Sequence, residues 1–241
     1  MKKFWIFLGS LAAIGIMVGG YFLFVDPAHS KHRSLYVVQF IRNPELHSDW
    51  KMRAGIHCGS APFIFPTNGM VGYLWNDSFQ VGHRHQGIDI FGGTNTGLTP
   101  VIAAYDGYLS RLADWKSSVI IRIPSDPLHP GTQIWTYYTH MADSNGSSFI
   151  SSEFPAGTSE VYVKAGTLLG FQGDYSGDPD SPVGVHLHFS IVKDDGTGHF
   201  TNELKIANTM DPSLYFGLSL NAASNPDMPI LCLDALPTPT R

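Results

Sequence analysis

Short runs of β-branched and aromatic residues, broken by glycine or proline, constrain the fold of this chain more than any other feature. Examples are "SVIIRI" (118–123), "QIWTYYTH" (133–140) and "VHLHFSIV" (185–192). Such runs favour short strands, and the 25 glycines and 16 prolines supply the turns between them. We therefore predict a mainly β protein with little helix.

Several further segments predict secondary structure. "TPVIAAYDGYLSRL" (99–112) suggests two strands that meet at the tight turn Asp106-Gly107, and "VYVKAGTLLGFQG" (161–173) suggests two more around a glycine turn. "LYVVQFI" (35–41) is a further strand candidate. The best helical turn is "DPSLYF" (211–216), in which Asp211 is the expected N-cap and Pro212 the first helical residue.

The N-terminal segment has a different composition from the rest of the chain. From Phe4 to Val25 there are 22 residues without a charge, preceded by Lys2 and Lys3. About 20 apolar residues suffice to cross a bilayer, whereas the apolar region of a secretory signal is about 7 to 15 residues long. We expect an uncleaved transmembrane helix, with a cleaved signal as the alternative. Either kind of segment would put the rest of the chain outside the cytoplasm if Lys2 and Lys3 stay on the cytoplasmic side.

Length and charge limit the remaining organisation. A chain of 241 residues, 43% of them hydrophobic, can build one sizeable core with flanking segments. Its net charge of -5 gives no basic footprint, so we expect no nucleic-acid partner. The expected parts are a cytoplasmic N-terminus (1–3), the anchor or signal (4–25), a juxtamembrane tether or small cover (26–60), the main domain (61–217) and a C-terminal tail (218–241).

Two cysteines, Cys58 and Cys232, bracket the main domain. In an oxidising compartment such a pair most simply forms an intramolecular disulfide. Two unpaired buried thiols are the alternative.

The segment "VHLHF" places two histidines two residues apart. On a strand, His186 and His188 would project from the same face about 7 Å apart, while Leu187 and Phe189 would face the core. Imidazole is the commonest metal ligand, but two imidazoles are too few for a site, and His-x-His also occurs by chance on exposed strands.

The segment "HRHQGID" offers a second pair of candidate ligands. His85 and Asp89 are four residues apart, a spacing that suits one face of a helix or of an extended segment. Gly87, Ile88 and Ile90 oppose helix, so an extended segment is preferred.

Together, His85, Asp89 and one histidine of the His186/His188 pair form the ligand set expected of catalytic zinc, with a fourth position left to water. Structural zinc sites are more often closed by four ligands rich in cysteine. His140 ends an aromatic strand, where a lone histidine is more often a structural residue than a catalytic one.

The order and spacing of "HRHQGIDI", "YTHM" and "VHLHFSI" resemble the motifs of the lysostaphin-like, LytM-type zinc metallopeptidases, which include the β-lytic type. The family pattern is His-x-x-x-Asp, then Tyr-x-His, then His-x-His followed by Phe. "TPVIAAYDGYLSRL", "VKAGTLLGFQGDYSG" and "DPSLYF" resemble further blocks of the family. The resemblance covers about residues 61–217 and implies an antiparallel, barrel-sandwich-like LytM domain, the duplicated hybrid motif fold.

Carried over residue by residue, the resemblance implies a site with one Zn2+ per chain. His85, Asp89 and His188 would bind the metal, and His140 and His186 would be the catalytic pair beside it.

Other parts of the sequence depart from the family pattern. His83, His129 and His199 match no motif position, and we expect them to be surface residues. "PSDPLHPGT" (124–132) and "SSFISSEFPAGTSE" (147–160) are longer than the pattern requires and would reshape the cleft.

The resemblance implies a zinc-dependent endopeptidase that cleaves stem or cross-bridge peptides of bacterial cell-wall peptidoglycan. Its location would be the bacterial cell envelope, as a single-pass membrane protein held by its N-terminal helix, or as a secreted or periplasmic protein after signal cleavage. One alternative is a catalytically silent LytM-type scaffold or amidase activator, although such members typically lack metal ligands. A lower-ranked alternative is a lipoyl- or biotinyl-like carrier or adaptor, for which Lys164 is not set in the usual modification motif.

Overall fold

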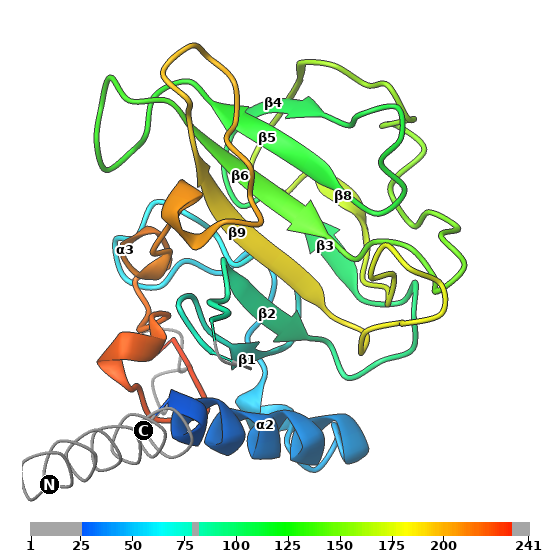
Figure 1. Cartoon of the computed structure of the whole chain (residues 1–241), viewed down its shortest axis with the longest axis vertical. Coiled ribbons are helices and arrows are strands. Elements are labelled where there is room, and N and C mark those ends of the chain that lie inside the picture. The colour runs from blue at the N-terminus through cyan, green and yellow to red at the C-terminus, as the bar shows by residue number, and fades with distance from the viewer. Residues whose placement is uncertain (1–25, 79–81, 233–241) are drawn as a thin grey trace, which may run out of the picture.

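The computed structural model describes residues 26–78 and 82–232 and is built mainly from antiparallel strands (Figure 1). The main sheet has eight strands, in the order β1-β2-β9-β6-β5-β4-β7, with β10 also paired to β9. A second sheet joins β3 to β8. The strands are β1 (Met70–Tyr73), β2 (Ile88–Phe91), β3 (Pro100–Ile102), β4 (Gly107–Ser110), β5 (Val119–Ile123), β6 (Ile134–Thr139), β7 (Val161–Val163), β8 (Leu168–Phe171), β9 (Leu187–Lys193) and β10 (Thr209–Met210).

The strands predicted between residues 99 and 192 exist, but neither of the two expected strand pairs, β3 with β4 and β7 with β8, is formed. β3 does not pair with β4 across Asp106-Gly107; it pairs with β8, while β4 pairs with β5 and β7. The carboxylate of Asp106 explains part of this arrangement, because it accepts hydrogen bonds from the amide of Ala165 at 2.7 Å and the hydroxyl of Tyr162 at 2.9 Å. The turn is therefore tied to the β7 segment, and its two flanking strands join different sheets.

Strand β9 lies inside the main sheet, between β2 and β6, and shows the predicted alternation of faces. Leu187, Phe189 and Ile191 are fully buried in the largest hydrophobic cluster. His188 points to the opposite face, since successive side chains of a strand alternate. β9 thus supplies core residues on one face and the candidate site residue His188 on the other.

Helix α2 (Asp26–Arg42) replaces the strand predicted at 35–41. Arg33, Val37 and Phe40 are buried and recur at intervals of four and three residues, which gives the helix one inward face. Val37 and Phe40 pack with Met70 and Phe91, and α2 runs along the β1–β2 end of the sheet (Figure 1). This contact favours helix over the local strand preference of the β-branched residues.

The expected placement as a single-pass membrane protein is contradicted. Across residues 26–78 and 82–232, none of the helices combines the length and the apolar character that a membrane span requires. The longest of them, α2, has 17 residues and a buried arginine, Arg33. Such a helix is about 25 Å long, whereas the hydrocarbon core is about 30 Å thick. The apolar run at residues 4–25 lies outside the described residues.

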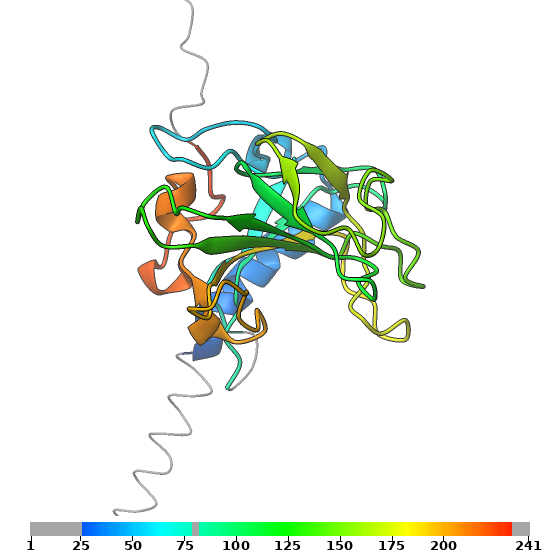
Figure 2. The same ribbon diagram turned by 90° about the horizontal axis from the view of Figure 1, so that it is seen from above.

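Short helical segments complete the fold; three of them, between residues 206 and 224, gather on one side of the molecule, and η1 lies against α2 through a ring contact between Trp50 and Tyr36 (Figure 2). A disulfide joins Cys58 to Cys232, as predicted, with the two Cα atoms 5.4 Å apart. Asp211 accepts a hydrogen bond from the amide of Ser213 at 2.9 Å at the start of the predicted helical turn. The segments are η1 (Ser48–Trp50), η2 (Ile206–Asn208), α3 (Ser213–Phe216) and η3 (Ala222–Ser224).

Candidate metal centre

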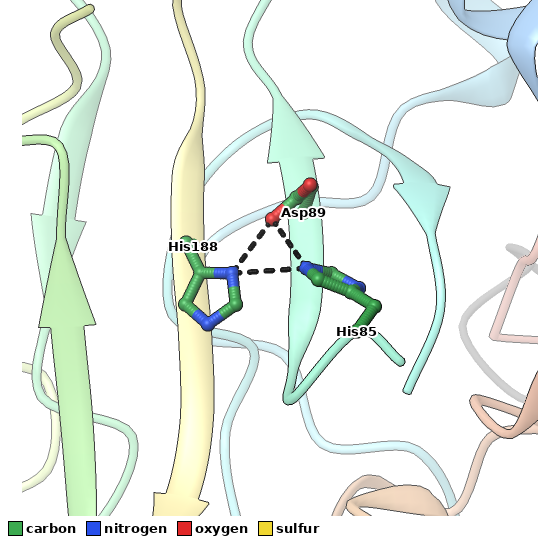
Figure 3. Close-up of side chains that lie close together, drawn as sticks. All are labelled: His85, Asp89 and His188. Carbon is green, nitrogen blue, oxygen red and sulfur yellow. Dashed lines mark hydrogen bonds and ion pairs between the residues drawn. The ribbon is translucent and has the colours of Figure 1, made fainter. Parts of the chain in front are cut away.

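Three of the predicted site residues converge beside the β2–β9 pair. Asp89 on β2 lies directly opposite His188 on β9, and His85 lies on the extended segment before β2. Asp89 Oδ1 is 2.9 Å from His188 Nδ1 and 3.1 Å from His85 Nε2, and the two nitrogens are 3.0 Å apart. The three polar ends point toward one another (Figure 3).

This triangle fits a zinc ion in donor type and spacing. Tetrahedral zinc holds nitrogen and oxygen ligands at about 2.0–2.1 Å, so that its ligand atoms lie about 3.3 Å apart. The Nδ1–H of His85 donates to the carbonyl oxygen of Leu74 at 2.9 Å. That bond leaves the Nε2 lone pair of His85 directed into the triangle, as in metal-ligating histidines whose other nitrogen is held by a carbonyl. Two imidazoles and one carboxylate could therefore hold the metal.

The electrostatics of the triangle suit a dication. Burial alone would raise the pKa of Asp89, but His85 and His186 outweigh it and hold this pKa well below its ordinary value. Burial lowers the pKa of His188. Burial would also lower the pKa of His85, but Asp89 raises it overall. Asp89 is thus ionised and His188 neutral, and a bound metal would displace any proton shared between His85 and Asp89.

His140 and His186 lie beside the triangle, with ring centroids 4.4 Å apart. The Nδ1–H of His140 donates to the carbonyl of Tyr175 at 2.7 Å, and that of His186 donates to the carbonyl of Gly184 at 2.5 Å. His186 also stacks on the ring of Phe91, at 5.1 Å between centroids. Both imidazoles are therefore fixed in orientation and in tautomer, with Nε2 available as the second nitrogen.

The backbone of His140 supports a functional interpretation of this residue. Its φ of 71° lies in the left-handed region, which is uncommon for residues other than glycine and is concentrated at functional sites. Burial, with the neighbouring His186 imidazole adding to it, lowers the pKa of His140 to about 3. The His140 imidazole is therefore neutral at pH 7.

A cleft of about 880 Å3 contains all five predicted site residues. One wall comes from α2, through Ser34, Val37 and Ile41, within the segment 26–60 that was expected as a tether or small cover. His83 is half-buried and lines the cleft. His129 and His199 are exposed, as predicted.

Comparison with known proteins gives structural neighbours and no sequence match. No family model matches the chain, and no curated protein does. The structural neighbours include the lysostaphin catalytic domain from Staphylococcus simulans, at 20% identity over 62% of this chain and 92% of that one, with a TM-score of 0.41. A longer lysostaphin structure from the same organism is 20% identical over 71% of this chain and 55% of that one, with a TM-score of 0.42. This chain therefore spans about half of that protein.

A third neighbour is a mutant catalytic domain of the prophage-encoded M23 protein EnpA from Enterococcus faecalis. It is 24% identical over 62% of this chain and 94% of that one, with a TM-score of 0.35. The neighbours are lysostaphin and M23 peptidase domains, the kind of protein that the motifs resemble. These TM-scores lie below 0.5, and no function is carried over from the neighbours to this chain.

Gly87 provides a test of how closely β2 and β9 must approach to form the triangle. A Cβ at this position would lie 2.1 Å from the carbonyl oxygen of Phe189 and 3.0 Å from His188 Nε2. We expect Gly87→Ala to lower the free energy of unfolding by about 1–3 kcal/mol, the cost of overpacking, and to weaken zinc binding by separating Asp89 from His188. Urea unfolding and zinc titration measure the two effects.

The control for this substitution is Gly184→Ala. A Cβ there would meet only a ring carbon of Phe91, at 3.8 Å. This variant should unfold within about 0.5 kcal/mol of the wild type. Equal stability and equal zinc affinity in Gly87→Ala and the wild type would contradict the role given to Gly87.

Proposed function

We propose that this chain is a zinc-dependent endopeptidase that cleaves peptide bonds in bacterial cell-wall peptidoglycan. The observation that carries the proposal is the convergence of His85, Asp89 and His188 within about 3 Å of one another, next to the imidazoles of His140 and His186. A three-ligand set beside two oriented imidazoles suits metal-assisted hydrolysis better than a closed structural site.

His85, Asp89 and His188 would hold one zinc ion. When bound, the metal would act as a Lewis acid that polarises the scissile carbonyl and lowers the pKa of water. The neutral His140 imidazole would accept or return a proton at Nε2, because its Nδ1 is committed to the carbonyl of Tyr175. His186 would orient the same reaction through its Nε2, which lies 3.5 Å from Asp89 Oδ1. Such proton transfers contribute about 10²–10⁴-fold to a rate.

The substrate class follows from the motif resemblance, which spans about residues 61–217. Stem and cross-bridge peptides are the usual substrates of that family. The open cleft of about 880 Å3 offers room for a peptide segment along the site. A silent scaffold or amidase activator remains the competing function, and the presence of all five site residues favours the enzyme.

The test uses the full-length chain and purified peptidoglycan. We expect the zinc-loaded wild type to release soluble peptides, and His140→Ala to lower the initial rate about 10²–10⁴-fold with its zinc content unchanged. His199→Ala is the matched control, because the His199 side chain is 79% exposed. No peptide release by the zinc-loaded wild type would reject the enzyme in favour of the scaffold, and full activity of His140→Ala would reject the role of His140.

A further inference from the structure

Glu203 is an unexplained charge in the cleft. Among the cleft-lining residues that the structure describes, Asp89 and Glu203 are the only carboxylates, and none is a lysine or arginine. Asp89 is committed to the histidines, whereas Glu203 forms no ion pair or side-chain hydrogen bond with any described residue. Two nearby cations, Arg84 two residues before Gln86 and Lys205 two residues after Glu203, are exposed and do not line the cleft. The carboxylate of Glu203 is half-buried and open to a ligand from the cleft.

Two polar neighbours of Glu203 have their hydrogens committed elsewhere. The Gln86 amide donates from Nε2 to the carbonyls of Arg84 at 2.7 Å and Leu204 at 3.1 Å. Both of its hydrogens are used, so Gln86 is left with the acceptor Oε1. The hydroxyl of Tyr137 donates to Ser118 Oγ at 2.9 Å and has no hydrogen left for a ligand, while its ring contacts Trp115 at 5.5 Å between centroids and lines the cleft.

The three side chains occupy one part of the cleft. The bond from Gln86 to the Leu204 carbonyl ties the segment before β2 to the residue after Glu203. Burial raises the pKa of Tyr137, and the charge of Glu203 adds to the rise, as expected for neighbouring groups. Glu203, Gln86 and Tyr137 therefore present a carboxylate, an amide oxygen and an aromatic ring, all of which attract a cation with hydrogens to donate.

This group lies a short way along the sheet from the metal centre. Thr139 on β6 is paired with His188, and Tyr137 is two residues earlier on the same face. Two residues of strand correspond to about 7 Å, roughly the reach of two residues of an extended peptide.

We propose that Glu203, Gln86 and Tyr137 form an ammonium-binding subsite, which selects substrate peptides that carry a free amino group within about two residues of the scissile bond. An ammonium has three donors and no acceptor, so it complements a subsite made of acceptors and a ring face. The inference rests on the proposed peptidase function and adds to it the charge of the preferred substrate.

The experiment compares one batch of purified peptidoglycan before and after acetylation of its free amines with acetic anhydride. The full-length wild type, Glu203→Gln and Glu153→Gln are assayed for peptide release and for co-sedimentation with the insoluble substrate. Glu153→Gln makes the same chemical change at an exposed position that does not line the cleft. For a half-exposed ion pair we expect acetylation to lower wild-type release about three- to fivefold, and Glu203→Gln to lower it equally on untreated substrate.

Loss of sensitivity to acetylation in Glu203→Gln, with wild-type sensitivity in Glu153→Gln, supports the subsite. If acetylation lowers peptide release equally in Glu203→Gln and the wild type, the subsite proposal is wrong. It is also wrong if acetylation does not lower release by the wild type. If the wild type releases nothing, the peptidase proposal fails and co-sedimentation decides the inference alone. If acetylation weakens co-sedimentation of the wild type but not of Glu203→Gln, the subsite is supported. If acetylation changes co-sedimentation of neither protein, the subsite is rejected.

Discussion

Replacing His188 with alanine is expected to remove zinc from the protein and to abolish peptide release. The change deletes one of three ligand atoms and leaves Asp89 and His85, whose polar atoms are 3.1 Å apart. Loss of a residue that merely supports a ligand typically costs 10–100-fold in metal affinity, so loss of a ligand itself should cost at least about 100-fold. Competition with a chelator measures the affinity, and metal analysis after dialysis measures the content.

His186→Ala separates metal binding from proton transfer. His186 lies two residues from His188, and its replacement leaves the three proposed ligands intact. We expect this control to keep close to one zinc per chain, and to lose activity about 10²–10⁴-fold. If His188→Ala kept wild-type zinc affinity, or if His186→Ala lost zinc as completely as His188→Ala, the assignment of the two histidines would be wrong.

The strands from β3 to β9 were predictable from the sequence because their signal is local. The alternation in β9 places Leu187 and Phe189 in the core and His188 on the opposite face, and a period of two is enough to foresee this. Strand partners were not predictable in the same way. The β3–β8 and β4–β7 pairs join segments more than 50 residues apart, and no local pattern encodes such pairings.

The site was predictable in its residues but not in its supports. The motif spacing predicted that His85 and Asp89 share a candidate site, and the structure brings them together, whereas the Leu74 carbonyl that orients His85 has no side-chain signal in the sequence. The same holds for the left-handed backbone of His140. Helix α2 was mistaken for a strand because its β-branched residues favour strand locally, while packing of Val37 against the sheet decides the outcome.

A buried ion pair connects α2 to the segment that carries His85. Arg33 Nε lies 2.6 Å from Asp77 Oδ2 and its Nη2 lies 2.7 Å from Oδ1, and both side chains are at most 3% exposed. The carbonyl of Asp77 in turn accepts a hydrogen bond from the amide of His85 at 2.8 Å. One pair therefore fixes the cleft wall formed by α2 and supports the backbone of a proposed metal ligand.

Arg33→Ala is accordingly expected to lower the free energy of unfolding by about 3–5 kcal/mol, because it leaves the Asp77 carboxylate buried without its partner. We also expect weaker zinc binding, since the Asp77 segment no longer holds His85 in place. Urea unfolding followed by tryptophan fluorescence measures the stability, and zinc titration of the folded variant measures the second effect.

Arg42→Ala is the matched control, since Arg42 is exposed in the last turn of the same helix, and it should change stability by less than about 0.5 kcal/mol. Replacing both partners, as Arg33→Met with Asp77→Leu, removes the uncompensated charge and should recover much of the loss, because a buried pair is often replaceable by apolar residues. If the double variant were as unstable as Arg33→Ala, the cost would come from lost packing of α2. If Arg33→Ala matched Arg42→Ala, the pair would contribute nothing to holding the cleft wall.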